Sequence, residues 1–248
     1  MPLLLQRLLL VTTMTSVNVL IPVYKAEKTL ERSINSVLSQ TVYNNIDLFI
    51  TIVINGPLDG SVEISQNLAK KYGKINILYS QPGIVPALNH GLKTSKQSDF
   101  IARIDADDIW YPQKLEKQLN VFKENLQLDI LGTQIRLVNL GSWEPTGVPI
   151  QYPLDHDEMV NFLKAGHNPI AHPSVLFRSR ILKKVGGYDD LFPLAEDMWL
   201  WSKAVLCGYK IGNTPDVLVD YTSTHNPNYK PIVGQLVSCV HRLVGQIS

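Results

Sequence analysis

The sequence predicts an α/β protein built on a mostly parallel, doubly wound sheet. In the first half of the chain, short apolar segments alternate with amphipathic segments of helical period, as expected where strand and helix alternate. Residues 48–54 are almost continuously apolar and β-branched, which is typical of a strand buried on both faces of a parallel sheet. Turn-forming residues follow this segment at 55–60. A sheet of this kind binds ligands at the carboxyl ends of its strands.

The strands expected in the first half are short and rich in apolar and β-branched residues. Pro22 ends the first of them, and Asn, Gly, Pro and Asp follow the second. The expected strands are residues 17–22, 48–54, 75–79 and 100–104.

The helices expected between and after these strands repeat apolar residues at helical spacing. In the first helix, Leu30, Ile34 and Leu38 stand four residues apart. In the third, Pro86 falls in the first turn, where a missing amide proton is tolerated. The expected helices are residues 25–40, 61–72, 84–94 and 112–125.

The second half has a less regular pattern, which predicts a smaller, mixed part of the sheet. A segment rich in Gly and Pro at 141–153 is expected to be an excursion, and Asp155 is expected to cap the helix that follows. The segment 195–207 is apolar nearly all round, so we expect a buried helix. The other expected elements are strands at 129–140, 175–178 and 216–221, a helix at 155–165 and a helical apolar stripe at 232–244.

Composition restricts the classes of function. The 248 residues are 45% hydrophobic and carry a net charge of +1, which excludes intrinsic disorder and argues against a nucleic-acid partner. Two cysteines are too few for a disulfide framework and favour a reducing cytoplasm. The apolar run at 3–11 is too short to span a bilayer, and Arg7 inside it argues against a signal peptide. We expect residues 1–16 to be an extension without a functional role, with Met14 as an alternative translation start.

The strongest chemical feature is a group of three acids, Asp105, Asp107 and Asp108, directly after a buried strand. In an extended segment the first two point the same way. Carboxylates gathered at the end of a parallel strand repel one another unless a cation or hydrogen-bond donors neutralise them, and hard divalent cations prefer oxygen ligands and substrate phosphates. The placement points to a metal–diphosphate site. The competing interpretation is a solvated acidic loop before a helix.

A second pair of acids, Glu196 and Asp197, opens the buried helix. A carboxylate at the mouth of an apolar environment has a raised pKa and can act as a general base. The competing interpretation is favourable charge placement at a helix start. The sequence holds no GxGxxG, GxxxxGK[ST], HExxH or CxxC motif, which disfavours a dinucleotide dehydrogenase, a P-loop enzyme and a structural zinc site.

Six motifs in order, over residues 17 to about 225, resemble a family 2 inverting glycosyltransferase of the GT-A fold. They resemble in particular the small bacterial enzymes that build O-antigen or capsule repeats. The motifs are IPVYKAEKTLERSINSVLSQT, IVINGPLDGS, GIVPALNHGL, FIARIDADDIWYPQKLEKQ, HPSVLFR and AEDMWLW.

The resemblance implies a nucleotide pocket at the ends of the first two strands. Pro22, Tyr24 and Glu27 would line it. Asn55 stands where the family usually has an Asp that accepts a hydrogen bond from uracil N3–H, and its carbonyl oxygen can still accept that bond. Asp59 matches the second acid of that turn.

The resemblance also implies how the two acid groups act. Arg103 would face the nucleotide or diphosphate, and Asp105 would hold the ribose side. Asp107 would bind Mn²⁺ or Mg²⁺, and Asp197 would be the catalytic base.

A late histidine, His225, lies where the family's His can approach the metal or diphosphate. Here, however, Thr222 stands where the family often has Arg after Tyr.

The implied reaction is the transfer of a hexose, with galactose and glucose as first expectations, from a UDP-sugar to a saccharide acceptor. The acceptor would be a polyprenyl-diphosphate-linked intermediate, and inversion would give a β-linkage. Residues 17–128 would form the nucleotide-sugar half and 129–248 the acceptor half of one domain, working in the cytoplasm or peripherally on the inner membrane's cytoplasmic face. The alternative is a non-catalytic nucleotide-sugar-binding subunit of an assembly complex.

Overall fold

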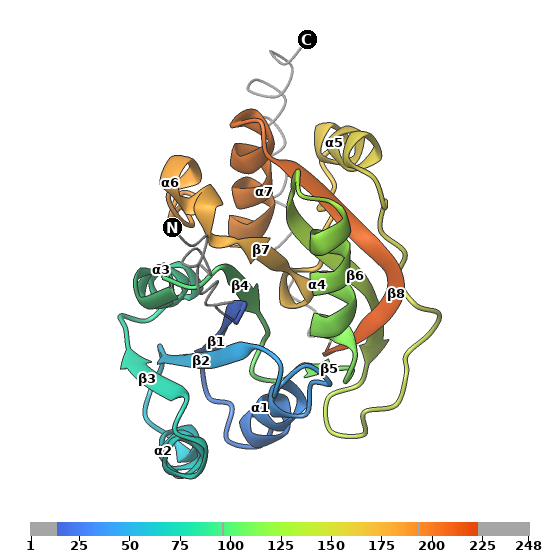
Figure 1. Cartoon of the computed structure of the whole chain (residues 1–248). Coiled ribbons are helices and arrows are strands. Elements are labelled where there is room, and N and C mark those ends of the chain that lie inside the picture. The colour runs from blue at the N-terminus through green and yellow to red at the C-terminus, as the bar shows by residue number, and fades with distance from the viewer. Residues whose placement is uncertain (1–13, 96, 193, 223–248) are drawn as a thin grey trace, which may run out of the picture.

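The computed structural model describes residues 14–95, 97–192 and 194–222, and these form one sheet covered by helices (Figure 1). The strand order is β3-β2-β1-β4-β7-β6-β8-β5. The strands are β1 Ser16–Val23, β2 Asp47–Ile54, β3 Ile75–Tyr79, β4 Phe100–Arg103, β5 Ile109–Trp110, β6 Leu128–Val138, β7 Leu176–Arg178 and β8 Lys210–Thr222.

The first half of the sheet is parallel, as the sequence predicted. Strand β1 pairs in parallel with β2 on one side and with β4 on the other, and β2 pairs in parallel with β3. The chain therefore winds outward from β1 in both directions. The carboxyl ends of β1, β2 and β4 meet at the point where the winding reverses, which is where such sheets bind ligands.

The second half of the sheet is mixed. Strand β7 is antiparallel to β4 and β6, β6 and β8 are parallel, and β5 is antiparallel to β8. Ile109 and Trp110, for which the sequence predicts no strand, pair with the end of β8. Strand β8 begins at Lys210, six residues before the predicted start. The first half of β8 contains Gly, Asn and Pro, and its pattern does not indicate a strand. Register shifts around Gly132 and Gln134 of β6 allow β6 to pair with this part of β8.

The helices follow the predicted pattern with two differences. Helix α1 begins at Leu30 rather than 25, because residues 26–29 form a turn in which the Thr29 amide donates to the Ala26 carbonyl. The short helix α6 was not predicted. The α-helices are α1 Leu30–Leu38, α2 Gly60–Tyr72, α3 Ile84–Ser95, α4 Lys114–Glu124, α5 His156–Lys164, α6 Leu182–Val185 and α7 Glu196–Leu206. The predicted stripe at 232–244 lies outside the described residues.

Two hydrophobic cores lie on the two faces of the sheet, and Figure 1 shows the helices that cover these faces. Helices α1, α2 and α4 pack on one face, and α3, α5, α6 and α7 pack on the other. Strand β2 is thus covered on both sides, which explains its continuous apolar sequence. Among the described helices, none is long and apolar enough to cross a membrane.

Candidate active site

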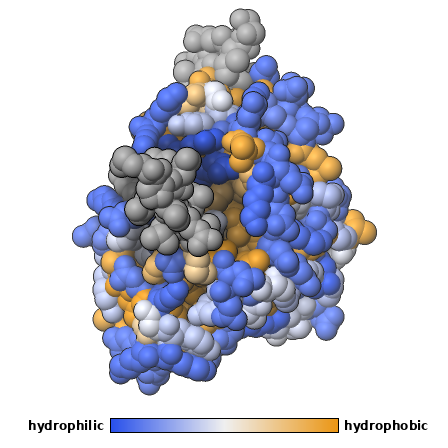
Figure 2. All heavy atoms as spheres, viewed as in Figure 1, coloured by the Kyte–Doolittle hydropathy of each residue, from blue (hydrophilic) through white to orange (hydrophobic). Residues whose placement is uncertain are grey.

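A cleft of about 1250 Å³ opens where the loops after β1, β2 and β4 come together. The loop after β6 contributes Leu140, Gly141 and Trp143 to its wall, and Leu194 lines it just before α7. Figure 2 shows that the face seen in Figure 1 is mostly hydrophilic and is hollowed near its centre, where hydrophobic side chains are exposed. The cleft therefore joins segments from both halves of the chain.

The residues expected around the nucleotide that line this cleft are Pro22, Tyr24, Glu27, Asn55, Asp59, Asp105 and Asp107. Arg103, which was expected to face the nucleotide or diphosphate, is instead buried and is not among the lining residues. Tyr24 is 57% exposed, and its ring packs directly on Gly56, where a Cβ would lie 2.4 Å from a ring carbon. The Glu27 carboxylate accepts the Gly60 amide at 3.1 Å, and Asp59 caps α2 by accepting the Ser61 amide at 3.1 Å. These contacts tie the end of β1 to the start of α2.

Asn55 has a fixed amide orientation. Its Nδ2 donates to the Gly83 carbonyl at 2.9 Å. Its Oδ1 is buried and has no hydrogen-bond partner among the described residues. A buried acceptor without a partner is costly, so a ligand donor at this position would be favoured.

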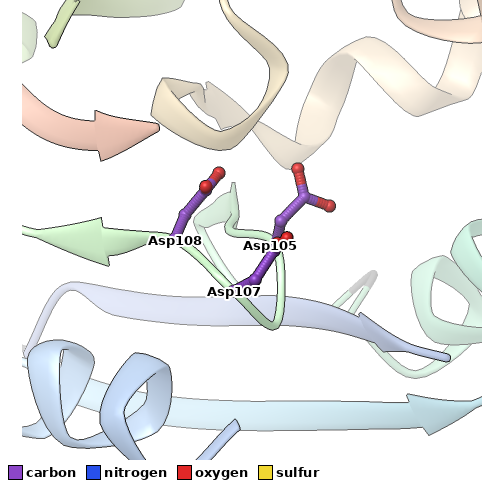
Figure 3. A group of neighbouring side chains, drawn as sticks. All are labelled: Asp105, Asp107 and Asp108. Atoms are coloured by element: carbon purple, nitrogen blue, oxygen red, sulfur yellow. The ribbon is translucent and has the colours of Figure 1, made fainter. Parts of the chain in front are cut away.

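Asp105, Asp107 and Asp108 lie together on the loop between β4 and β5, and each offers a carboxylate oxygen within 4.8 Å of the others (Figure 3). Arg103 pairs with both oxygens of Asp105. Thr222 donates its amide to Asp108 Oδ1 at 2.7 Å, whereas Asp108 Oδ2 is buried and has no partner among the described residues.

Burial and mutual repulsion disfavour the charged forms of these carboxylates. Burial and the Asp105 charge raise the pKa of Asp107 to about 6 and raise the pKa of Asp108 well above its ordinary value. A cation would relieve both effects. The all-oxygen donor set and the orphaned Asp108 Oδ2 fit a hard divalent ion, which Asp107 and Asp108 would hold. The predicted ligand His225 lies outside the described residues.

The second acid pair lies at the start of α7. Asp197 accepts the Met198 amide at Oδ1 and the Asn168 side-chain amide at Oδ2, both at 2.7 Å. Glu196 is buried, with Oε1 3.6 Å from His172 Nδ1. Burial and the neighbouring Asp197 raise the pKa of Glu196 to about 8. The two adjacent carboxyls therefore have different environments.

Arg103 connects the two acid groups electrostatically. Its side chain is buried, and although burial by itself lowers its pKa, the charges of Asp105 and other neighbours raise it above the ordinary value. The Arg103 charge also lowers the pKa values of Glu196 and Asp197. The fold thus brings acids about ninety positions apart in the sequence into one electrostatic environment.

Sequence reasoning missed Asn168 and Tyr188 as parts of this site. Tyr188 OH lies 2.9 Å from His172 Nε2, and Asn168 contacts Asp197. Both residues lie in irregular segments, so no periodicity marks them. Among the motifs named above, HPSVLFR, which begins at His172, is the one that indicates this part of the site.

The family described as "Glycosyl transferase family 2" matches residues 18–186. The O-antigen biosynthesis glycosyltransferase WbnJ of Escherichia coli is 31% identical over 219 residues, covering 86% of this chain and 79% of WbnJ. The amylovoran biosynthesis glycosyltransferase AmsE of Erwinia amylovora is 29% identical over 209 residues, covering 82% of this chain and 74% of AmsE. An uncharacterized glycosyltransferase of Haemophilus influenzae is 28% identical over 218 residues, covering 83% of this chain; the chain spans 64% of that relative's length.

Solved structures share the fold. Residues 1–349 of Staphylococcus aureus TarS in complex with UDP give a TM-score of 0.69 at 18% identity, covering 91% of this chain and 65% of that chain. The complex of the same TarS fragment with UDP-GlcNAc gives a TM-score of 0.67 at 18% identity, covering 92% of this chain and 66% of that chain. The curled, mostly parallel sheet is of the GT-A type, as expected. Because the family match covers more than half of the sequence, the chain belongs to glycosyl transferase family 2.

Proposed function

We propose that this protein is a metal-dependent inverting glycosyltransferase that uses a UDP-sugar. One observation carries the proposal: three carboxylates gather within 4.8 Å just after β4, and two of them, Asp105 and Asp107, line the same cleft as Asn55. Such a site matches a sugar nucleotide, whose diphosphate requires a cation and whose base requires hydrogen-bond partners.

Asn55 supports a uridine donor. Because its Nδ2 is held by Gly83, the atom left free is an acceptor. Uracil N3–H is a donor, whereas cytosine and adenine have acceptors at the matching ring position. The Asn at this position is therefore compatible with a base that carries a ring N–H donor, as uracil does. The TarS complexes with UDP and UDP-GlcNAc, which share the fold, are consistent with this donor class.

The residues divide the chemistry between them. Asp197 takes the proton of an acceptor hydroxyl, so that the hydroxyl oxygen can attack the anomeric carbon from the face opposite the diphosphate. Arg103 holds Asp105 toward the ribose side of the donor. A divalent cation, which Asp107 and Asp108 would hold, would neutralise the charge that develops on the departing diphosphate. One displacement inverts the anomeric centre, so an α-linked donor gives a β-glycoside.

The acceptor is proposed to be a saccharide, linked to polyprenyl diphosphate, in an O-antigen or related polysaccharide pathway. The names of WbnJ and AmsE, which place those relatives in O-antigen and amylovoran biosynthesis, support this class. Galactose and glucose are the first sugars to test. Such an acceptor would place the enzyme in the cytoplasm, in peripheral contact with the inner membrane.

The first test is calorimetric binding of UDP, with and without Mn²⁺, to wild type, Asp107→Ala and Asp47→Ala. Asp47 is an exposed acid paired with Lys74 at 2.7 Å and is the matched control. We expect metal-dependent UDP binding in wild type and in the control but not in Asp107→Ala. If the protein binds GDP or dTDP but not UDP, the assignment of a uridine donor is wrong. If it binds none of these nucleotides, the proposed enzymatic function is wrong.

The second test distinguishes catalysis from binding alone. UDP release from UDP-galactose and UDP-glucose is measured with lipid-linked acceptors in wild type and Asp197→Asn. We expect transfer in wild type and loss of transfer, with UDP binding kept, in the variant. Nucleotide binding without transfer of any tested sugar would favour the non-catalytic subunit.

A further inference from the structure

The two acids that open α7 differ in what faces them. Glu196 faces the ring of His172, which in turn contacts the Tyr188 hydroxyl. Asp197 instead accepts two N–H donors, one on each oxygen. A carboxylate that accepts hydrogen bonds is stabilised in its charged form. Burial raises the pKa of both carboxyls, but the two N–H donors offset this effect in part at Asp197.

The surroundings of Asp197 make the donor from Asn168 important. Burial raises the pKa of Asp197, whereas the bonds from Asn168 and Met198 and the charge of Arg103 lower it. Of these three, the Met198 amide belongs to the helix backbone. Arg103 already pairs with Asp105. Asn168 is thus the hydrogen-bonding side chain that directly orients this carboxylate.

Other titratable groups face Asp197 from the elements packed around it. Glu196 precedes it on the same helix, and burial together with the Asp197 charge raises the pKa of Glu196 to about 8. Burial raises the pKa of Tyr188 and of the partly buried Tyr221, so both remain neutral phenols. Arg103 is the positive charge acting on Asp197.

Asn168 is itself held in place. Gly166 adopts a left-handed conformation, with φ of 84°, and its amide bonds back to the Leu163 carbonyl at the end of α5. The Asn168 Oδ1 accepts the Ile170 amide at 3.3 Å. With its oxygen engaged there, the Asn168 amide presents its N–H toward Asp197, which it meets at 2.7 Å.

We propose that Asn168 is a positioning residue of sugar transfer: its side-chain N–H holds the Asp197 carboxylate in the orientation in which a remaining lone pair accepts the proton of the acceptor hydroxyl. In that step the acceptor O–H bond breaks and its proton goes to Asp197. The acceptor oxygen bonds to the anomeric carbon, and the bond from that carbon to the diphosphate breaks with its electron pair leaving on UDP. This inference rests on the proposed function, because it takes Asp197 as the base.

The sharpest variant is Asn168→Asp. It keeps the shape of the side chain and an oxygen for the Ile170 amide, and it replaces only the donor facing Asp197. Asn168→Ala removes both contacts, and Asn161→Ala changes an exposed asparagine on α5 as the control. All are compared with wild type and Asp197→Asn by UDP release across pH, using the donor and acceptor pair that wild type turns over.

In both Asn168 variants we expect kcat to fall about tenfold or more, with KM values for donor and acceptor nearly unchanged. The acid limb of the kcat profile should move to higher pH, further for Asn168→Asp, where a second carboxyl faces the base. A ¹³C NMR titration of the side-chain carboxyls, with Asp197→Asn used to assign the resonance, should show the same shift without turnover.

The outcomes separate the two proposals. If wild type transfers no sugar, or Asp197→Asn remains active, the proposed function is wrong. If Asp197→Asn is inactive while folded Asn168→Asp keeps the wild-type kcat, pH profile and Asp197 titration, only the positioning role of Asn168 is refuted.

Discussion

Thr222 holds the acidic loop at two points. Its amide donates to Asp108 Oδ1 at 2.7 Å, and its hydroxyl donates to the Asp107 carbonyl at 2.7 Å. Thr222 ends β8 and lies 114 residues after Asp108. At the position where the family often has Arg, this chain therefore has a short side chain that orders the backbone between two carboxylates.

Replacing Thr222 by Val should weaken the acid cluster without changing side-chain volume. The hydroxyl bond to Asp107 is lost while the amide bond to Asp108 remains, so we expect a loss of about 1 kcal/mol in unfolding free energy. Mn²⁺ binding should weaken roughly fivefold. Calorimetry and thermal unfolding measure both. Thr94→Val, which removes a hydroxyl bond to the Gly91 carbonyl on α3, should leave Mn²⁺ binding unchanged.

Asn55→Ala should lower UDP affinity selectively. It removes the free acceptor expected for uracil N3–H, at a cost of about 1 kcal/mol or roughly fivefold in Kd. CDP cannot donate from its N3, so its weaker binding should not change. Titration of both nucleotides into wild type and the variant tests this, with exposed Asn76→Ala as the control. Equal binding of UDP and CDP by wild type would argue against base recognition by Asn55.

Glu196→Gln should change how stability depends on pH. Burial and Asp197 raise the pKa of Glu196 from 4.5 to about 8 in the folded protein. Between these values the folded state keeps a proton that the unfolded state releases, so stability falls as pH rises. Gln does not titrate and should remove this fall, which is at most about 1.4 kcal/mol per pH unit. Urea unfolding at pH 5, 6.5 and 8 measures it. Parallel stability curves for the variant and wild type would count against the prediction, and exposed Glu124→Gln is the control.

Arg32→Ala should loosen the loop that carries Trp143 into the cleft wall. The Arg32 guanidinium carbon lies 3.7 Å from the Trp143 ring centroid, and Trp143 has a positive φ of 61°. A left-handed non-glycine residue persists only where its surroundings hold it. Loss of a contact of about 0.5–1 kcal/mol should speed amide exchange in 139–146 roughly two- to fivefold. Lys71→Ala, which removes an exposed cation–π pair with Tyr72, should have no effect there.

The sequence predicted the parallel half of the sheet well because its signals are local. Strand β2 is apolar except at Asp47 and Thr51, and segments with apolar residues at helical spacing separate the strands. The same local pattern put Asp105 and Asp107 just after β4 and Asn55 just after β2, so the position of these three cleft residues followed from the alternation of strands and helices. The cleft residues Leu140, Trp143 and Leu194 did not follow from it.

The second half could be predicted only in part. Strand β8 passes through Gly212 and Pro215, and its pairing with β6 depends on register shifts that no local pattern encodes. Strand β5 has only two residues and exists because β8 lies beside it. Elements of this kind form where the rest of the sheet supplies a partner, so intrinsic propensity does not show them.

The sequence by itself determined which chemical groups this protein has and at which strand ends they stand. The tertiary structure alone decided their states: Gly83 orients the Asn55 amide, Thr222 holds the loop of Asp108, and Asn168 meets Asp197. Orientation and ionisation depend on hydrogen bonds and burial contributed by segments far away in the chain, and those contacts exist only once the chain has folded.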